Sequence, residues 1–225
     1  MQWNPLPIPD QQLAEQLQTE IGVPFEISCL LAQRGIQDYE MAKSFFRPAL
    51  TDLHDPFLML GMREAVNRIK SSVESGEKIM VFGDYDVDGT TAVALVYSFL
   101  IQEHPNCFYY IPDRYQEGYG ISTQGIDHAK IEEVGLIIAL DCGIKAVEKV
   151  DYAQSLGIDF IICDHHLPGE IIPNAAAVLD PKQPNCNYPF KDLCGCGIGF
   201  KLIQALTQEK GGSIHDIIPF MDLVA

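Results

Sequence analysis

The chain has 225 residues, of which 47% are apolar and 20% charged, a composition typical of globular proteins. It contains no apolar run of the roughly 18 residues that a membrane span needs, and its start lacks the features of a secretion signal. Fifteen Lys and Arg against 31 Asp and Glu give a net charge of −16, which excludes a broad basic face for nucleic acid within these residues.

The seven cysteines are odd in number, and Cys142 and Cys163 lie in apolar runs, where reduced, buried thiols are usual. We therefore expect a cytoplasmic protein that does not contact a membrane. The acidic charge leaves three interpretations open. The ligand is not a polyanion, or metal ions neutralise part of the acid, or the nucleic-acid-binding surface lies outside this chain.

Residues 1–55 are expected to form a small helical N-terminal region. The stretches QQLAEQLQTEIG, SCLLAQRGI and DYEMAKSFFRP place apolar residues three and four positions apart, which indicates short amphipathic helices. The last of these stretches ends at Pro48, a residue that does not continue a helix.

Residues 56–225 are expected to form an open α/β domain, because helix-like and strand-like segments alternate from residue 63 onward. The expected strands are KIMVF, CFYYIP, LIIAL, IDFIIC and AAAVLD, and the expected helices cover 63–76, 90–103, 123–133, 145–156 and 197–211. Strands this apolar are buried on both faces, as in a mainly parallel sheet with helices on both sides.

Acidic residues and histidines follow three of the expected strands. KIMVF is followed by Asp84, Asp86 and Asp88, LIIAL by Asp141, and IDFIIC by Asp164, His165 and His166. Ligands bind at the carboxyl ends of parallel strands, so these side chains are expected to converge. For Asp141 alone, a solvated loop residue is the simpler interpretation. The three strand ends together favour a shared site.

A cluster of like charges persists where cations neutralise it. Carboxylates alone suit Mg²⁺ or Mn²⁺, and added imidazole shifts the preference toward manganese, iron or zinc. Two such ions roughly 3.5 to 4 Å apart can clamp phosphate oxygens for in-line attack and lower the pKa of a water. The pattern therefore predicts a hydrolase of phosphoesters or pyrophosphate.

In order along the chain, GDYDVDGTTA, LDCG and CDHH resemble three motifs of the DHH phosphoesterase superfamily. Four further stretches resemble its RecJ branch of single-strand-specific exonucleases: RGIQDYEMAKSFFRP, YYIPDRYQEGYGIS, DHHLPGEIIPNAAAVLDPKQPN and CGCGIGFKLIQAL. The resemblance covers about residues 30–225. It implies a metal-dependent 5′-3′ exonuclease that acts on single-stranded DNA in recombination and repair, with a helicase and a single-strand-binding protein as possible partners.

The resemblance also implies a metal site with two ions, Mn²⁺ or Mg²⁺. Its ligands would be Asp86, Asp88, Asp141 and His165, with Asp88 and Asp141 nearest the shared centre. Some relatives have a histidine ligand at the position of Phe82, so one metal position lacks that ligand here.

Three further residues would belong to the catalytic group by the same resemblance. His166 would contact or polarise the scissile phosphate, and Asp164 would orient a histidine by a hydrogen bond. Asp84 would contact the ligand residues without binding a metal itself, or it would be a weaker metal ligand.

Two glycine-containing stretches are candidates for substrate contacts. In RYQEGYG, Arg114 would pair with phosphate and Tyr119 would stack on a base beside Gly120, or the stretch is a turn with an exposed tyrosine. In CGCGIGFK, the amides of Gly195 and Gly197 would face a phosphate, or these glycines allow close helix packing.

The resemblance implies a fourth motif with a further metal-binding aspartate beyond residue 225, then further domains, so these residues alone are expected to be weak or inactive as an enzyme. Two other functions stay open. A DHH hydrolase of short oligonucleotides, cyclic dinucleotides or pyrophosphate is favoured by the acidic charge. A non-catalytic binding relative is disfavoured by the intact acidic and histidine residues.

Overall fold

The structure is a computed structural model that describes residue 7 and residues 9–224. The expectation about a secretion signal rests on the first residues of the chain, and residues 1–6 lie outside the described part. The chain divides into two compact units, Met1–Leu53 and His54–Ala225. Within the described residues, the helices are all too short or too polar to cross a membrane.

The first unit contains the three short helices that the sequence indicated. They are α1 (Gln11–Ile21), α2 (Phe25–Gln33) and α3 (Tyr39–Phe46). The side chains of Asp10 and Asp38 accept hydrogen bonds from backbone N–H groups in the first turns of α1 and α3, which fixes where these helices begin. The helices enclose a small core of Leu17, Leu31, Ile36 and Ala42.

The second unit is built on a five-stranded sheet in the order β2-β1-β3-β4-β5. Its strands are β1 (Lys78–Gly83), β2 (Cys107–Tyr110), β3 (Val134–Leu140), β4 (Asp159–Cys163) and β5 (Ala177–Leu179). Every neighbouring pair is parallel. The open, parallel α/β fold expected from the apolar runs is therefore confirmed.

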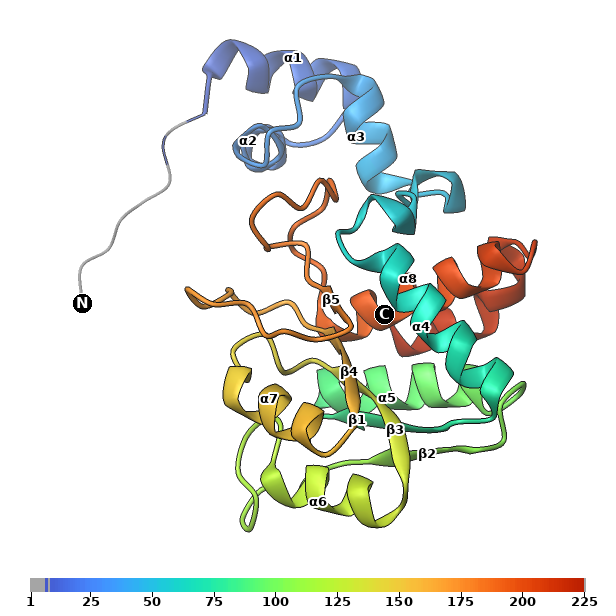
Figure 1. Cartoon of the computed structure of the whole chain (residues 1–225). Helices are drawn as coiled ribbons and strands as arrows, with labels where there is room; N and C mark the ends of the chain where they lie inside the picture. Colours follow the sequence, from blue (N-terminus) through green and yellow to red (C-terminus); the bar gives the residue numbers. More distant parts are fainter. Residues whose placement is uncertain (1–6, 8, 225) are drawn as a thin grey trace. The chain divides into compact units, whose positions relative to one another are not determined.

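Helices cover both faces of this sheet (Figure 1). They are α4 (Met62–Ser75), α5 (Val87–Leu100), α6 (Thr123–Ile131), α7 (Val147–Ser155) and α8 (Gly195–Glu209). The second unit also has short 3₁₀ segments at Pro56–Leu58 and Ile214–Leu223, and the first unit has one at Leu50–Asp52. Met80 and Phe82 of β1 pack with Ile126 of α6 and Val150 of α7. Because side chains alternate along a strand, the residues of β1 that alternate with Met80 and Phe82 face the layer of α4, α5 and α8.

The strand order places a switch point at the carboxyl ends of β1 and β3. From β1, the chain leads first to β2 on one side and then to β3 on the other, and ligands of open α/β sheets bind at such points. Gly83 pairs with Leu140, so Asp84 and Asp141 follow at neighbouring positions. A Cβ on Gly195 would lie 2.6 Å from the Asp141 Cβ atom, so only glycine lets α8 begin this close to the strand end.

Arg68 of α4 holds together the amino ends of the strands, opposite the carboxyl ends that carry the acidic residues. Its guanidinium donates to Glu77 at 2.7 Å, to Asp159 at 2.7 Å and to the carbonyl of Gly135 at 3.3 Å. The guanidinium lowers the pKa of Glu77, chiefly through this hydrogen bond. These contacts tie α4 to the start of β1, β3 and β4, far from the acidic strand ends.

We expect Arg68→Met to lower the free energy of unfolding by about 1–3 kcal/mol, because Glu77 and Asp159 lose their shared partner. Urea unfolding at neutral pH measures this loss. The matched control is Arg63→Met, since the Arg63 side chain is 54% exposed in its pair with Glu209 and such pairs contribute about 0–1 kcal/mol. Equal losses for the two variants would contradict this role of Arg68.

Candidate metal centre

Two carboxylates are buried at the carboxyl ends of β1 and β3. Asp84 is 0% exposed and Asp141 is 2% exposed. Within the described residues, neither oxygen of Asp84 has a hydrogen-bond partner. The Oδ1 atom of Asp141 also has none there. A buried carboxylate without donors is costly unless a cation neutralises it. The unpartnered oxygens therefore fit a bound metal ion.

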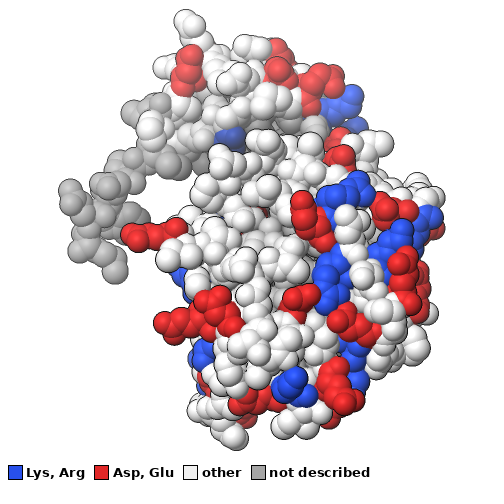
Figure 2. Space-filling view, viewed as in Figure 1, with Lys and Arg blue, Asp and Glu red and all other residues white. Residues whose placement is uncertain are grey.

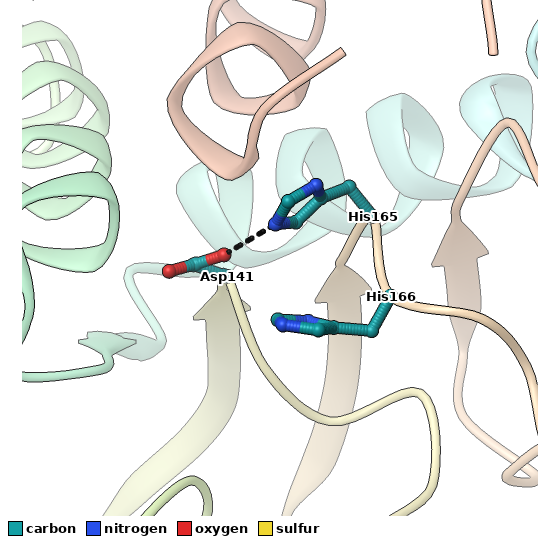
Figure 3. Close-up of side chains that lie close together, drawn as sticks. All are labelled: Asp141, His165 and His166. Atoms are coloured by element: carbon teal, nitrogen blue, oxygen red, sulfur yellow. Dashed lines mark ion pairs between the residues drawn. The ribbon is translucent and has the colours of Figure 1, made fainter. Parts of the chain in front are cut away.

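Asp141 belongs to two groups of metal-ligating side chains. One group combines it with Asp84 and Asp86, the other with His165 and His166, and in each group one donor atom per residue lies within 4.8 Å of the others. Figure 3 shows both imidazoles reaching from the loop after β4 toward Asp141. The Nε2 atom of His165 lies 3.1 Å from the Asp141 Oδ1 atom. Carboxylates on one side and imidazoles on the other are a suitable donor set for divalent cations.

The backbone holds Asp141 in an unusual conformation. Its N–H donates to the carbonyl of Cys163 at 2.8 Å, which extends the pairing of β3 and β4 by one residue. Its φ of 59° lies in the left-handed region that few residues other than glycine adopt. Burial, followed by the charges of Asp88 and Asp86, raises the pKa of Asp141 to about 8. Without a cation, this carboxyl therefore holds its proton near neutral pH.

The remaining aspartates of the first motif are held by helix ends. Asp86 caps α5 and accepts a hydrogen bond from its first turn at 2.9 Å. Both oxygens of Asp88 accept from the start of α8, from the N–H groups of Gly195 and Cys196, each at 2.7 Å. The Oδ2 atom of Asp88 also lies 3.6 Å from the Nε2 atom of His165. The positive end of α8 thus stabilises the Asp88 charge beside His165.

Asp164 is the anchor of the two histidines. Its Oδ1 atom accepts from the backbone N–H groups of His165 at 2.7 Å and His166 at 3.1 Å, and lies 2.7 Å from the Nδ1 atom of His166. Its Oδ2 atom accepts from the Ile144 N–H at 2.8 Å. Burial, and then the neighbouring His166, lower the pKa of His165. The lowered pKa favours the neutral imidazole, the form that binds metals.

The loop after β2 brings its expected residues to the rim of this centre. The Arg114 guanidinium lies 5.2 Å from the ring centroid of Tyr85, and the Tyr119 hydroxyl lies 3.2 Å from the Nε2 atom of His166. Tyr119 and Gly120 line an open cavity of about 290 Å³ together with His166. Of the three residues that the sequence singled out in this loop, Tyr119 and Gly120 thus lie beside His166, and Arg114 lies against Tyr85.

Gly197 lies in the first turn of α8, where its N–H donates to the Sγ atom of Cys194 at 3.3 Å.

Sequence reasoning missed two residues near the histidines. Asp180 follows β5, is 0% exposed, has an unpartnered Oδ2 atom, and has its pKa raised to about 6 by burial. Lys182 donates to the carbonyl of His165 at 2.6 Å. The strand-end rule could have found Asp180, because AAAVLD also ends in an acid.

Comparison with known proteins matches residues 78–225 to the model of the DHH family, N-terminal domain. The single-stranded-DNA-specific exonuclease RecJ of Bacillus subtilis is 40% identical over 99% of this chain and 29% of the relative. The RecJ exonuclease of Escherichia coli is 34% identical over 87% of this chain and 35% of the relative. The chain therefore spans about a third of the length of these curated relatives.

Solved structures agree with this match. A crystal structure of exonuclease RecJ bound to manganese has a TM-score of 0.67 and 29% identity, over 74% of this chain and 42% of that one. A structure of Thermus thermophilus RecJ in complex with Mn²⁺ has a TM-score of 0.75 over 96% of this chain and 30% of that one, and its 24% identity speaks to the fold alone.

The raised pKa of Asp141 makes the stability of the metal-free protein depend on pH. The folded-state pKa of about 8 exceeds the ordinary value of 3.8, so the unfolded state loses this proton first. The Asp141 contribution to stability is therefore present below about pH 4 and lost as pH rises toward 8. In EDTA at pH 8, Asp141→Asn is expected to be more stable than the wild type by more than about 1 kcal/mol.

Urea unfolding in EDTA between pH 5 and pH 8 measures this effect. The control is Asp151→Asn, which removes an exposed carboxylate of α7 and is expected to keep the wild-type dependence on pH. If Asp141→Asn followed the wild-type curve, the carboxyl would not be strained by burial.

Proposed function

The chain belongs to the DHH family, and on that premise we propose that the protein carrying it is a metal-dependent exonuclease. It would hydrolyse the phosphodiesters of single-stranded DNA from the 5′ end, in recombination and repair. The observation that carries the proposal is the position of Asp141, buried and shared between a carboxylate group and an imidazole group. The names of the B. subtilis and E. coli relatives support the choice of substrate.

We propose that Asp84, Asp86 and Asp141 hold one Mn²⁺ or Mg²⁺ ion, and that Asp141 and His165 hold a second with Asp88 beside it. Asp84 joins the ligands because both its oxygens are buried without partners. Asp88 stays in the proposal because the α8 amides fix it next to His165. When bound, the ions would neutralise phosphate charge and activate a water.

The other residues would bind and orient the substrate. His166 would contact the scissile phosphate, with its ring oriented by Asp164. Arg114, exposed at the rim, would pair with a phosphate of the strand, and Gly120 would line its path. The Gly197 amide already donates to Cys194, so we leave it out of the substrate contacts.

We further propose that residues 1–55 form a helical region distinct from the phosphoesterase domain at 56–225, which the division between Leu53 and His54 supports. A cytoplasmic location is in keeping with the seven free cysteines. A helicase would supply the single strands, and a single-strand-binding protein would cover them.

A hydrolase of short oligonucleotides, cyclic dinucleotides or pyrophosphate is the second candidate. The net charge of −16 favours it, and on the face seen in Figure 2 Lys and Arg are interleaved with Asp and Glu. Such a surface offers a long polyanion little attraction. Turnover of a dinucleotide well above that of a long strand would favour this candidate over the exonuclease.

The direct test is degradation of 5′-labelled single-stranded DNA by the complete gene product. With Mn²⁺ or Mg²⁺ we expect release of labelled mononucleotides, and EDTA is expected to abolish it. Asp84→Asn and Asp141→Asn are expected to lose about a hundredfold or more in rate, because each removes a ligand. Asp151→Asn, with the same change at an exposed position of α7, is expected to keep wild-type activity.

Labelled DNA that stays intact with both metals would contradict the proposal. Degradation of the 3′ end first, followed with a 3′ label, would contradict the polarity alone.

A further inference from the structure

Tyr119 is held in place by the loop that carries it. Glu117 in this loop accepts from the backbone N–H of Asp113 at 2.8 Å, the hydroxyl of Tyr110 at 2.9 Å and the hydroxyl of Ser122 at 2.5 Å. Ser122 in turn caps α6 through its hydroxyl. One carboxylate thus ties the loop to the end of β2 and to the start of α6. Tyr119 lies between these anchors, although its side chain is largely exposed.

The hydroxyl of Tyr119 is the end of a chain of polar contacts that begins in the protein interior. Asp164, 1% exposed, lies 2.7 Å from the Nδ1 atom of His166, and the Nε2 atom of the same ring lies 3.2 Å from the Tyr119 hydroxyl. The other partners of Asp164 are backbone N–H groups, so its oxygens act as acceptors. The Nδ1 atom therefore carries a proton and donates to Asp164, which leaves the Nε2 atom facing the tyrosine hydroxyl.

These contacts fix the His166 ring at both nitrogens. The His166 side chain is 44% exposed, and Asp164 alone would leave one edge of the ring without a partner. The ring planes of Tyr119 and His166 are nearly perpendicular, at 86°, with the centroids 6.3 Å apart. In this arrangement the tyrosine supports the histidine from the side, and its hydroxyl is the contacting group.

We propose that Tyr119 is a positioning residue for His166, acting through its hydroxyl, and not only an aromatic surface for a base. This inference rests on the proposed function, in which His166 contacts the scissile phosphate. A ring that is already oriented before the strand arrives loses less freedom when the phosphate binds. The hydroxyl of Tyr119 would therefore contribute to the rate of hydrolysis more than to the affinity for DNA.

Two variants separate the hydroxyl from the ring. Tyr119→Phe keeps the ring and removes the hydrogen bond, and Tyr119→Leu removes both. In the complete gene product, with single-stranded DNA and Mn²⁺, Tyr119→Phe is expected to lower kcat about five- to tenfold and to leave KM within about twofold of the wild type. Tyr119→Leu is expected to lower kcat as much. The control is Tyr115→Phe, at a 94% exposed position of the same loop.

A wild-type kcat in Tyr119→Phe would overturn the inference. A rise in KM that occurs only in Tyr119→Leu would also overturn it, because that result is expected if Tyr119 is only a stacking surface. A wild-type protein that leaves DNA intact would overturn the proposed function instead.

A second readout needs neither metal nor DNA. In ¹⁵N NMR spectra of the metal-free protein, His166 is expected to carry a proton on Nδ1, with the Nε2 signal shifted by its hydrogen bond with the Tyr119 hydroxyl. Tyr119→Phe is expected to move the Nε2 signal toward that of a free ring nitrogen, while the same signal stays in place in Tyr115→Phe. An Nε2 signal that is the same in Tyr119→Phe and in the wild type would show that the hydroxyl does not hold the ring, whatever the activity.

Discussion

The structure depends on one electrostatic constraint, the confinement of several carboxylates at the ends of two neighbouring strands. Asp84 and Asp141 are both buried there, and three of their four oxygens lack a donor in the described part of the chain. Burial removes the water that would otherwise solvate these charges, so it disfavours the ionised form of both carboxyls and raises the pKa of each. A divalent cation relieves both costs at once. A metal ion bound at this centre would therefore offset an electrostatic cost that the fold already contains.

The rest of the domain holds this centre in a defined geometry before any ligand arrives. Strand pairing sets Asp84 and Asp141 side by side, and the first amides of α8 fix Asp88. Asp164 holds the backbone of His165 and His166 with one oxygen and the backbone of Ile144, in the loop after β3, with the other. Side chains held in this way lose little freedom on binding, which favours both metal affinity and catalysis.

Much of this could be predicted from the sequence, because long apolar runs that end in acids specify a parallel sheet and the edge where ligands bind. Local detail was less accessible. The helix expected to begin at residue 90 begins three residues earlier, at Val87, because the Asp86 side chain caps it there. The amides that hold Asp88 come from Gly195 and Cys196, more than a hundred residues away, and no local pattern reveals that contact. The hydroxyl contact of Tyr119 with His166 likewise depends on how two loops meet.

The most direct measurement is the number of protons released when Mn²⁺ binds to this chain at pH 7, obtained by calorimetry in two buffers with different ionisation enthalpies. Asp141, with its pKa raised to about 8, has to lose its proton when a cation takes its place. The account predicts binding accompanied by the release of close to one proton, an effect that disappears in Asp141→Asn. Absence of binding, or binding without proton release, would contradict the claim that a metal ion offsets the burial of these carboxylates.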